Sequence, residues 1–149
     1  MSLIIQLVSQ FWDWTEISEN QANRSLSSFN FDPLAFPKFH EMQACCTALI
    51  NTQLTPEELD AFLTCMALDE EDEEILDGCK ALGNDPFISS LVACGVHHRM
   101  REARWQIAEL LRKNIPGQQA YLELLLHDED QYVQKRARNV MADILGKQI

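Results

Sequence analysis

Residues 124–137 read LLLHDEDQYVQKRA, and this stretch gives the clearest structural signal in the chain. Three leucines close one apolar segment, acidic residues interrupt it, and Val133 and Ala137 start a second apolar stripe with helical spacing. The stretch therefore predicts the end of one helix, a short acidic turn and the first turns of another helix. We expect these two helices at residues 117–126 and 131–145.

The same pattern occurs once more, 34 residues earlier in the chain. A shift by this period places Ala103-Arg104 on Ala137-Arg138. The apolar positions of the preceding helix match as well, with Ile88, Leu91 and Val92 aligned to Leu122, Leu125 and Leu126. Helix pairs that recur every 20–50 residues or so stack into α-solenoids, because only a neighbouring pair covers the apolar face of each one. The preceding pair is expected within residues 86–112, with a long helix at about 98–113.

Upstream, further helix signals extend the pattern to residue 56. Thr55-Pro56 with Glu58 forms a capping-box sequence for a helix over 56–68. A second helix over 70–82 would end at Gly83, and Asp85-Pro86 would start the next one in the same way as Thr55-Pro56. We expect a third helix pair here, and we expect Asp85 to cap the helix that follows.

Residues 1–51 do not follow the repeat. A helical stripe from Leu3 to Phe11 predicts a first helix, a weak pattern indicates a second over 16–27, and another follows at 38–51. Between them, residues 29–37 contain three Phe and two Pro and predict a loop fixed to the core by its aromatic rings. The predicted architecture is a single all-α domain over 1–149, with 1–51 as an N-terminal helical cap and 56–145 as helix pairs.

The stretch at 124–137 resembles a HEAT repeat. That family has a leucine-rich first helix, an Asp in the turn, and Val-Arg-x-x-Ala at the start of the second helix; here Val133 and Ala137 match, and Gln134 stands where the family prefers Arg. The resemblance is clearest at 117–145 and weaker at 86–112. It implies a short α-solenoid, or α-α superhelix, in which a turn Asp and a second-helix Arg bond between neighbouring units. This would give structural roles to Arg101, Arg104, Arg136 and Arg138.

Charge is distributed unevenly along the chain, which has a net charge of −11. Residues 1–98 contain three basic and sixteen acidic side chains, whereas residues 99–149 contain nine basic and seven acidic ones. Such a balance disfavours nucleic acid and anionic membranes as partners and favours a basic protein. Ten acids without a base lie between residues 57 and 77, and they are the first candidate partner-binding set: Glu57, Glu58, Asp60, Asp69, Glu70, Glu71, Asp72, Glu73, Glu74 and Asp77. A solvated helix face with acids in the first turns is the alternative explanation of this run.

Aromatic residues provide the alternative partner-binding candidates. Trp105 and Tyr132 lie in the two helices that carry the repeat, and Trp12 and Trp14 lie in the first helix. Aromatic side chains are enriched where binding energy concentrates in protein interfaces, but they also fill helix–helix contacts. The sequence leaves both roles open.

Metal and catalytic motifs are incomplete. His40-Glu41 resembles the His-Glu pairs of HEAT-like deoxyhypusine hydroxylases, whose iron site needs several such pairs, and this chain has one. Cys94, His97 and His98 have suitable ligand types, but a fourth ligand is missing. No phosphate-binding glycine loop and no nucleophile motif occurs in the sequence. We therefore expect no enzyme activity, no metal and no cofactor.

The five cysteines include an adjacent pair and no C-x-x-C, which fits free thiols in a reducing compartment. No basic, apolar leader opens the sequence, and no apolar run is long enough to span a bilayer. The expected location is the cytoplasm.

These features together predict a non-catalytic, acidic protein-binding module that holds a basic protein. An immunity protein that neutralises a bacterial toxin is one such module. The alternatives are a HEAT-like lyase- or hydroxylase-type enzyme or enzyme-maturation factor, and a structural scaffold that binds a partner helix.

Overall fold

The computed structural model describes residues 2–16 and 32–147. This part of the chain contains eight α-helices and a short 3-10 helix, and it contains no strand. The predicted all-α class is confirmed. The elements are α1 (Leu3–Thr15), η2 (Pro33–Ala35), α2 (Phe39–Leu49), α3 (Pro56–Leu68), α4 (Glu74–Leu82), α5 (Asp85–Gly95), α6 (Arg101–Leu110), α7 (Gln118–Leu126) and α8 (Gln131–Lys147). The predicted helix at 16–27 and the first two Phe of the loop lie outside the described residues.

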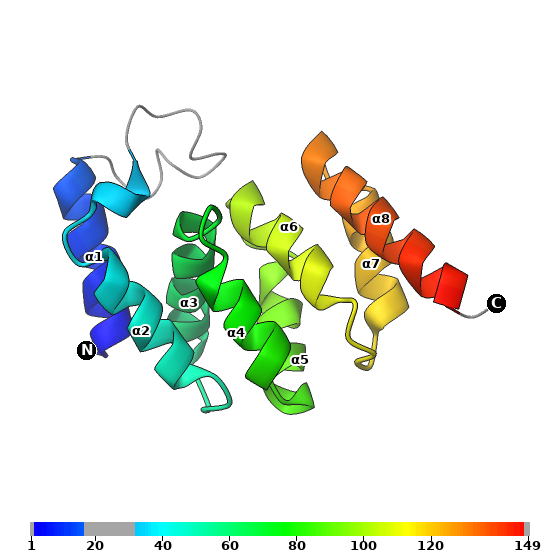
Figure 1. Cartoon of the computed structure of the whole chain (residues 1–149), viewed down its shortest axis with the longest axis horizontal. Coiled ribbons are helices and arrows are strands. Elements are labelled where there is room, and N and C mark those ends of the chain that lie inside the picture. Colours follow the sequence, from blue (N-terminus) through cyan, green and yellow to red (C-terminus); the bar gives the residue numbers. More distant parts are fainter. Residues whose placement is uncertain (1, 17–31, 148–149) are drawn as a thin grey trace.

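Two layers of helices form the described structure (Figure 1). Helices α2, α4, α6 and α8 follow one another in one layer, with contacts between α2 and α4, α4 and α6, and α6 and α8. Behind them, α1 contacts α3 and α3 contacts α5, while α7 packs against α8. Successive helices therefore alternate between the layers, and the chain advances along the row from α1 to α8.

The predicted capping residues begin the helices as expected at α3 but not at α5. Thr55 caps α3: its hydroxyl accepts from the Glu58 backbone N–H, and the Glu58 carboxylate accepts from the Thr55 N–H. At α5 the cap is Asn84, whose side chain accepts from the Phe87 backbone N–H at 2.9 Å. The prediction of Asp85 as the cap was wrong, because Asp85 is already the first helical residue.

The connection between α3 and α4 is longer than predicted. We expected a helix from residue 70, but α4 begins at Glu74. The Asp69 carboxylate accepts from the Ile75 backbone N–H at 2.8 Å, and Glu73 takes a left-handed conformation with φ of 53°. The hydrogen bond from Ile75 to the Asp69 side chain thus stabilises the non-helical connection that precedes α4.

Two apolar pairs of positions that the 34-residue shift superposes are buried alike. Ala103 in α6 and Ala137 in α8 are both fully buried, as are Leu91 in α5 and Leu125 in α7. In the N-terminal part, the Phe36 ring contacts Phe11 edge-to-face at 5.3 Å. One of the three loop Phe residues is therefore anchored in the core as predicted.

Arginines of α6 bond to acids of the α7–α8 turn. Arg104 donates to both carboxylate oxygens of Asp128, at 2.9 and 3.1 Å, and both side chains are more than nine-tenths buried. Arg101 donates to Asp130 at 3.2 Å. Both arginines thus join α6 to the turn between α7 and α8. Arg138, which was given the same role, lies exposed on α8 and makes no ion pair with the described residues.

Candidate functional site

The ten acids between residues 57 and 77 do not form one surface. Glu57, Glu58 and Asp60 lie in the first turns of α3, and the acids from residue 69 onward follow its last turn. Glu57 and Glu70 are thirteen positions apart, and most of these positions lie in α3, so the two acids are roughly 20 Å apart along its axis. The run is therefore divided between the two ends of α3.

Some of these acids have structural partners. Asp69 is only 1% exposed and accepts from the Gln43 side chain at 2.7 Å as well as from Ile75. Burial raises the pKa of Asp69, against the hydrogen bonds from Ile75 and Gln43. Asp69 therefore fits neither a partner-binding surface nor a solvated helix face. Its carboxylate fixes the α3–α4 connection and is not available to a partner.

Asp60 is also engaged within the chain. Its carboxylate accepts from Arg99 at 2.9 Å and lies 3.3 Å from Nε2 of the buried His98. Glu58 belongs to the capping box of α3, and its hydrogen bond from the Thr55 backbone lowers its pKa. The acids that lie exposed are Glu57, Glu71, Asp72, Glu74 and Asp77.

The two candidate sets, acidic and aromatic, meet in one place. A cavity of about 360 Å³ lies where the α3–α4 connection faces the first turns of α6 and α8. We call it the acid–aromatic cleft, and its lining residues are Glu70, Glu71, Glu73, Arg101, Trp105, Tyr132 and Arg136. The sequence presented these residues as alternatives, because 32 or more positions separate the acids of the cleft from its aromatic residues and no local pattern joins them.

One wall of the cleft is a stack of aromatic rings and a guanidinium group. The rings of Trp105 and Tyr132 meet edge-to-face at 5.8 Å, and the Arg136 guanidinium lies 4.4 Å from the Trp105 ring centre. Arg136 also donates to the Tyr132 hydroxyl at 2.7 Å and to the buried Glu109 at 2.6 Å. Burial raises the pKa of Glu109, but hydrogen bonds from Arg112 and Arg136 outweigh it, so the net shift is downward. The aromatic wall is thus rigid, and its own cation is already paired.

Glu70 forms the opposite side of the cleft. It is partly buried, and its carboxylate accepts a long hydrogen bond of 3.4 Å from the Trp105 indole N–H. Burial raises the pKa of Glu70, although this bond and the nearby Arg101 oppose the shift. The ionised carboxylate is incompletely solvated, so a cationic group that enters the cleft would stabilise it.

This raised pKa predicts how stability depends on pH. An acid whose pKa is higher in the folded state favours unfolding once both states are ionised. We therefore expect Glu70→Gln to raise the melting temperature at pH 7, with the gain disappearing as the pH falls below about 4.3, the ordinary value for Glu. Thermal melts between pH 3 and 8 measure this. Glu71→Gln is the matched control, since Glu71 is exposed. An equal gain in both variants, or a gain for Glu70→Gln that persists at pH 3, would contradict the assignment.

The candidate metal ligands either lie apart from one another or are hydrogen-bonded to other residues. His98 accepts from the Met100 backbone N–H through Nδ1, and its Nε2 faces Asp60 and Thr64, whereas Cys94 and His97 are exposed. His40 is bonded to Gln43 at 3.0 Å. Within residues 2–16 and 32–147, no three His, Cys, Asp or Glu side chains are grouped as a metal would require.

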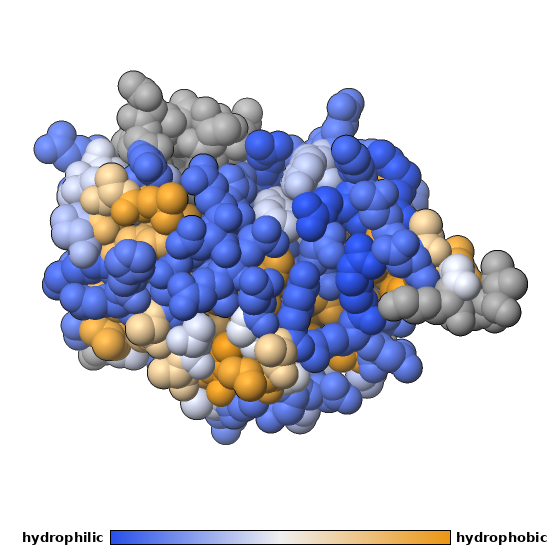
Figure 2. Space-filling view, in the orientation of Figure 1, coloured by the Kyte–Doolittle hydropathy of each residue, from blue (hydrophilic) through white to orange (hydrophobic). Residues whose placement is uncertain are grey.

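The face formed by α2, α4, α6 and α8 is mainly hydrophilic over α6 and α8 (Figure 2).

No helix in the described part of the chain is long and apolar enough to cross a membrane. Comparisons of the chain with protein-family models, curated protein sequences and solved structures gave no match.

Proposed function

We propose that the protein is a short α-solenoid of HEAT-like helix pairs with an N-terminal helical cap. The two alternating layers, the equal burial of Ala103 and Ala137 and the arginine–aspartate bonds between α6 and the α7–α8 turn support this architecture. Solenoids present extended surfaces to partner proteins.

Its function, in this proposal, is to hold a basic protein, without catalysis. The observation that supports this is the unequal pairing of charges. Five of the six arginines after residue 98 are paired within the chain, and only Arg138 is not paired with a described residue. The pairs are Arg99 with Asp60, Arg101 with Asp130, Arg104 with Asp128, and Arg112 and Arg136 with Glu109. In contrast, Glu71, Glu74 and Asp77 are exposed around the α3–α4 connection and make no ion pair with the described residues. Around the α3–α4 connection the unpaired charge is therefore negative, and it lies beside a rigid aromatic wall.

A basic side chain of the partner fits the acid–aromatic cleft. Glu70, Glu71 and Glu73 provide carboxylates, and Trp105 with Tyr132 provides a flat apolar surface against which an Arg or Lys stem can pack. An immunity protein that covers a basic bacterial toxin in the cytoplasm is the class of module that these properties suit best. The acids at the rim would act mainly by speeding the encounter.

The folding of a neutralised variant is the first part of the test. We expect the combined change Glu70→Gln, Glu71→Gln, Glu73→Gln and Glu74→Gln, here called the quadruple variant, to fold and to melt at or above the wild-type temperature. It removes like charges that repel one another and leaves the Arg101–Asp130 and Arg104–Asp128 pairs intact. A thermal melt monitored by circular dichroism measures this, and a large loss of stability would show that these acids serve the fold.

Binding is the second part. In affinity capture from a lysate of the source cell, we expect wild-type protein to retain a basic protein at low salt and release it as salt rises, and the quadruple variant to retain much less of it. The matched control neutralises four exposed acids elsewhere, Glu41, Asp85, Glu123 and Glu129, as Gln or Asn. If both variants retained the same amount of the basic protein, the acids at the α3–α4 connection would be solvated residues with no part in binding.

A further inference from the structure

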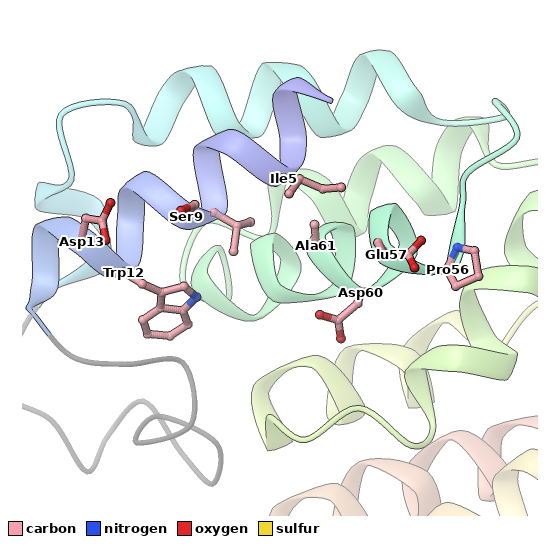
Figure 3. A pocket seen from close by; sticks show the side chains of 9 residues that line it. Ile5, Ser9, Trp12, Asp13, Pro56, Glu57, Asp60 and Ala61 are labelled. Atoms are coloured by element: carbon pink, nitrogen blue, oxygen red, sulfur yellow. The ribbon is translucent and has the colours of Figure 1, made fainter. Parts of the chain in front are cut away.

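A groove lies between α1 and α3, away from the acid–aromatic cleft (Figure 3). Its volume is about 670 Å³. The floor is apolar and is formed by Ile5, Val8 and Trp12 of α1 and by Ala61 of α3. Apart from Ile5, which is half-buried, these side chains are buried, so the groove is a concave surface of the core.

The Trp12 side chain has an unsatisfied polar group at this groove. Trp12 is 7% exposed, and its indole N–H has no acceptor in the described part of the chain. The ring is held edge-to-face against Phe11 at 5.1 Å, and in Figure 3 its nitrogen faces along the groove toward α3. A buried N–H without an acceptor costs free energy, which a carbonyl oxygen offered by a ligand would recover.

Acids stand at both ends of the floor. Asp13 lies beyond Trp12 on α1, and Glu57 lies in the first turn of α3 (Figure 3). Both are exposed, and neither makes an ion pair with the described residues, whereas Asp60 between them is already bonded to Arg99. The groove thus combines an apolar floor, a free N–H donor and two free carboxylates. Anionic lipids and nucleic acid are repelled by such a rim.

The dimensions and the donor suit a helix. Ile5 and Trp12 are seven positions apart on α1, roughly 10 Å, and this length matches two turns of a helix laid along the groove. The last turn of a helix has free backbone carbonyls and favours Lys or Arg. Placed over Trp12, this turn offers an acceptor to the indole N–H and basic side chains to Asp13.

We propose that the α1–α3 groove binds a basic amphipathic helix of a partner protein, with the C-terminal turn of that helix over Trp12 and Asp13. The apolar face of the partner helix covers Val8 and Ala61. This docking mode is that of a helix in a groove. It uses a surface other than the acid–aromatic cleft and does not depend on what binds there.

The probe for the test is a synthetic helical peptide of twelve residues, with leucines on one face and lysines on the other, and a version with glutamate in place of lysine. The chain has three Trp, so its indole N–H signals are assigned in the NMR spectrum of labelled protein from single Trp→Phe variants. We expect the lysine peptide to shift the Trp12 signal saturably and the glutamate peptide to leave it unchanged. A Trp12 signal that the lysine peptide does not move would overturn the proposal.

Variants then locate the peptide. Ser9 lines the groove and is exposed, so Ser9→Arg fills the groove and adds a positive charge without entering the core. We expect it to weaken binding of the lysine peptide at least tenfold, while the matched Ser90→Arg on α5, also exposed, has little effect. The quadruple variant should bind the peptide like wild type. If Ser9→Arg and Ser90→Arg weakened peptide binding equally, the peptide would not bind in the groove. Loss of peptide binding in the quadruple variant alone would likewise contradict the groove as the binding site.

Discussion

Ala137→Glu should unfold the protein at a temperature roughly 10 °C or more below that of the wild type. Ala137 is fully buried on α8, where this helix packs against α6 and α7. A glutamate there either places an unpaired charge in the core or forces the helices apart, and an uncompensated buried charge costs about 3–5 kcal/mol. The measurement is a thermal or urea melt followed by circular dichroism.

The same helix provides the control for this change. Ala142 is exposed on α8, so Ala142→Glu introduces the same side chain in the same helix without burying it. We expect its effect on the free energy of unfolding to be within about 0.5 kcal/mol of zero. If the two variants melt together, the face of α8 that packs on α6 has been assigned wrongly.

Asp128→Ala should also cost about 3–5 kcal/mol of unfolding free energy, because it leaves the Arg104 guanidinium buried without its carboxylate. Arg104 and Asp128 each have a side chain only 8% exposed, and two hydrogen bonds join them. Arg104 keeps the backbone carbonyls of His98 and Arg99 as acceptors. The carboxylate that remains near it belongs to Glu129, which lies 3.9 Å away and is 88% exposed, so solvent screens this pair. Urea unfolding of the variant and the wild type gives the difference directly.

A solvent-exposed ion pair provides the control, because its loss shows what an ion pair contributes when it is not buried. Arg112 and Asp143 also bond to each other, but 57% of the Asp143 side chain is exposed. We expect Asp143→Ala to cost less than about 1 kcal/mol. Comparable losses for Asp128→Ala and Asp143→Ala would mean that burial of the Arg104–Asp128 pair does not determine its strength.

Local signals in the sequence predicted the helices and their packing faces well. The capping box at Thr55 and the buried faces of α6 and α8 follow from short-range patterns, which depend only on helix geometry. The HEAT resemblance implied a structural role for Arg104, but it did not name Asp128 as its partner. The start of α4 was not predicted, because the hydrogen bond from Ile75 to Asp69 competes with the helix and a run of acids gives no sign of it.

The candidate site was predicted only in part. Acids and aromatics were identified as separate alternatives, and the cleft that joins Glu70 to Trp105 depends on how α3, α6 and α8 pack. The α1–α3 groove was missed altogether. The sequence identifies Trp12 as an aromatic candidate for binding. Whether its indole N–H has an acceptor depends on how the helices pack, and no sequence pattern indicates it.

The association rate with the captured basic protein tests the central proposal most directly. Stopped-flow mixing at several salt concentrations compares wild type, the quadruple variant and the control with neutral residues at 41, 85, 123 and 129. Charges at the rim of an interface act on encounter more than on dissociation. The account predicts that the quadruple variant associates at least tenfold more slowly than wild type at low salt, that its rate depends less on salt, and that the control stays close to wild type. Identical association rates and salt dependences for the quadruple variant and wild type would contradict it.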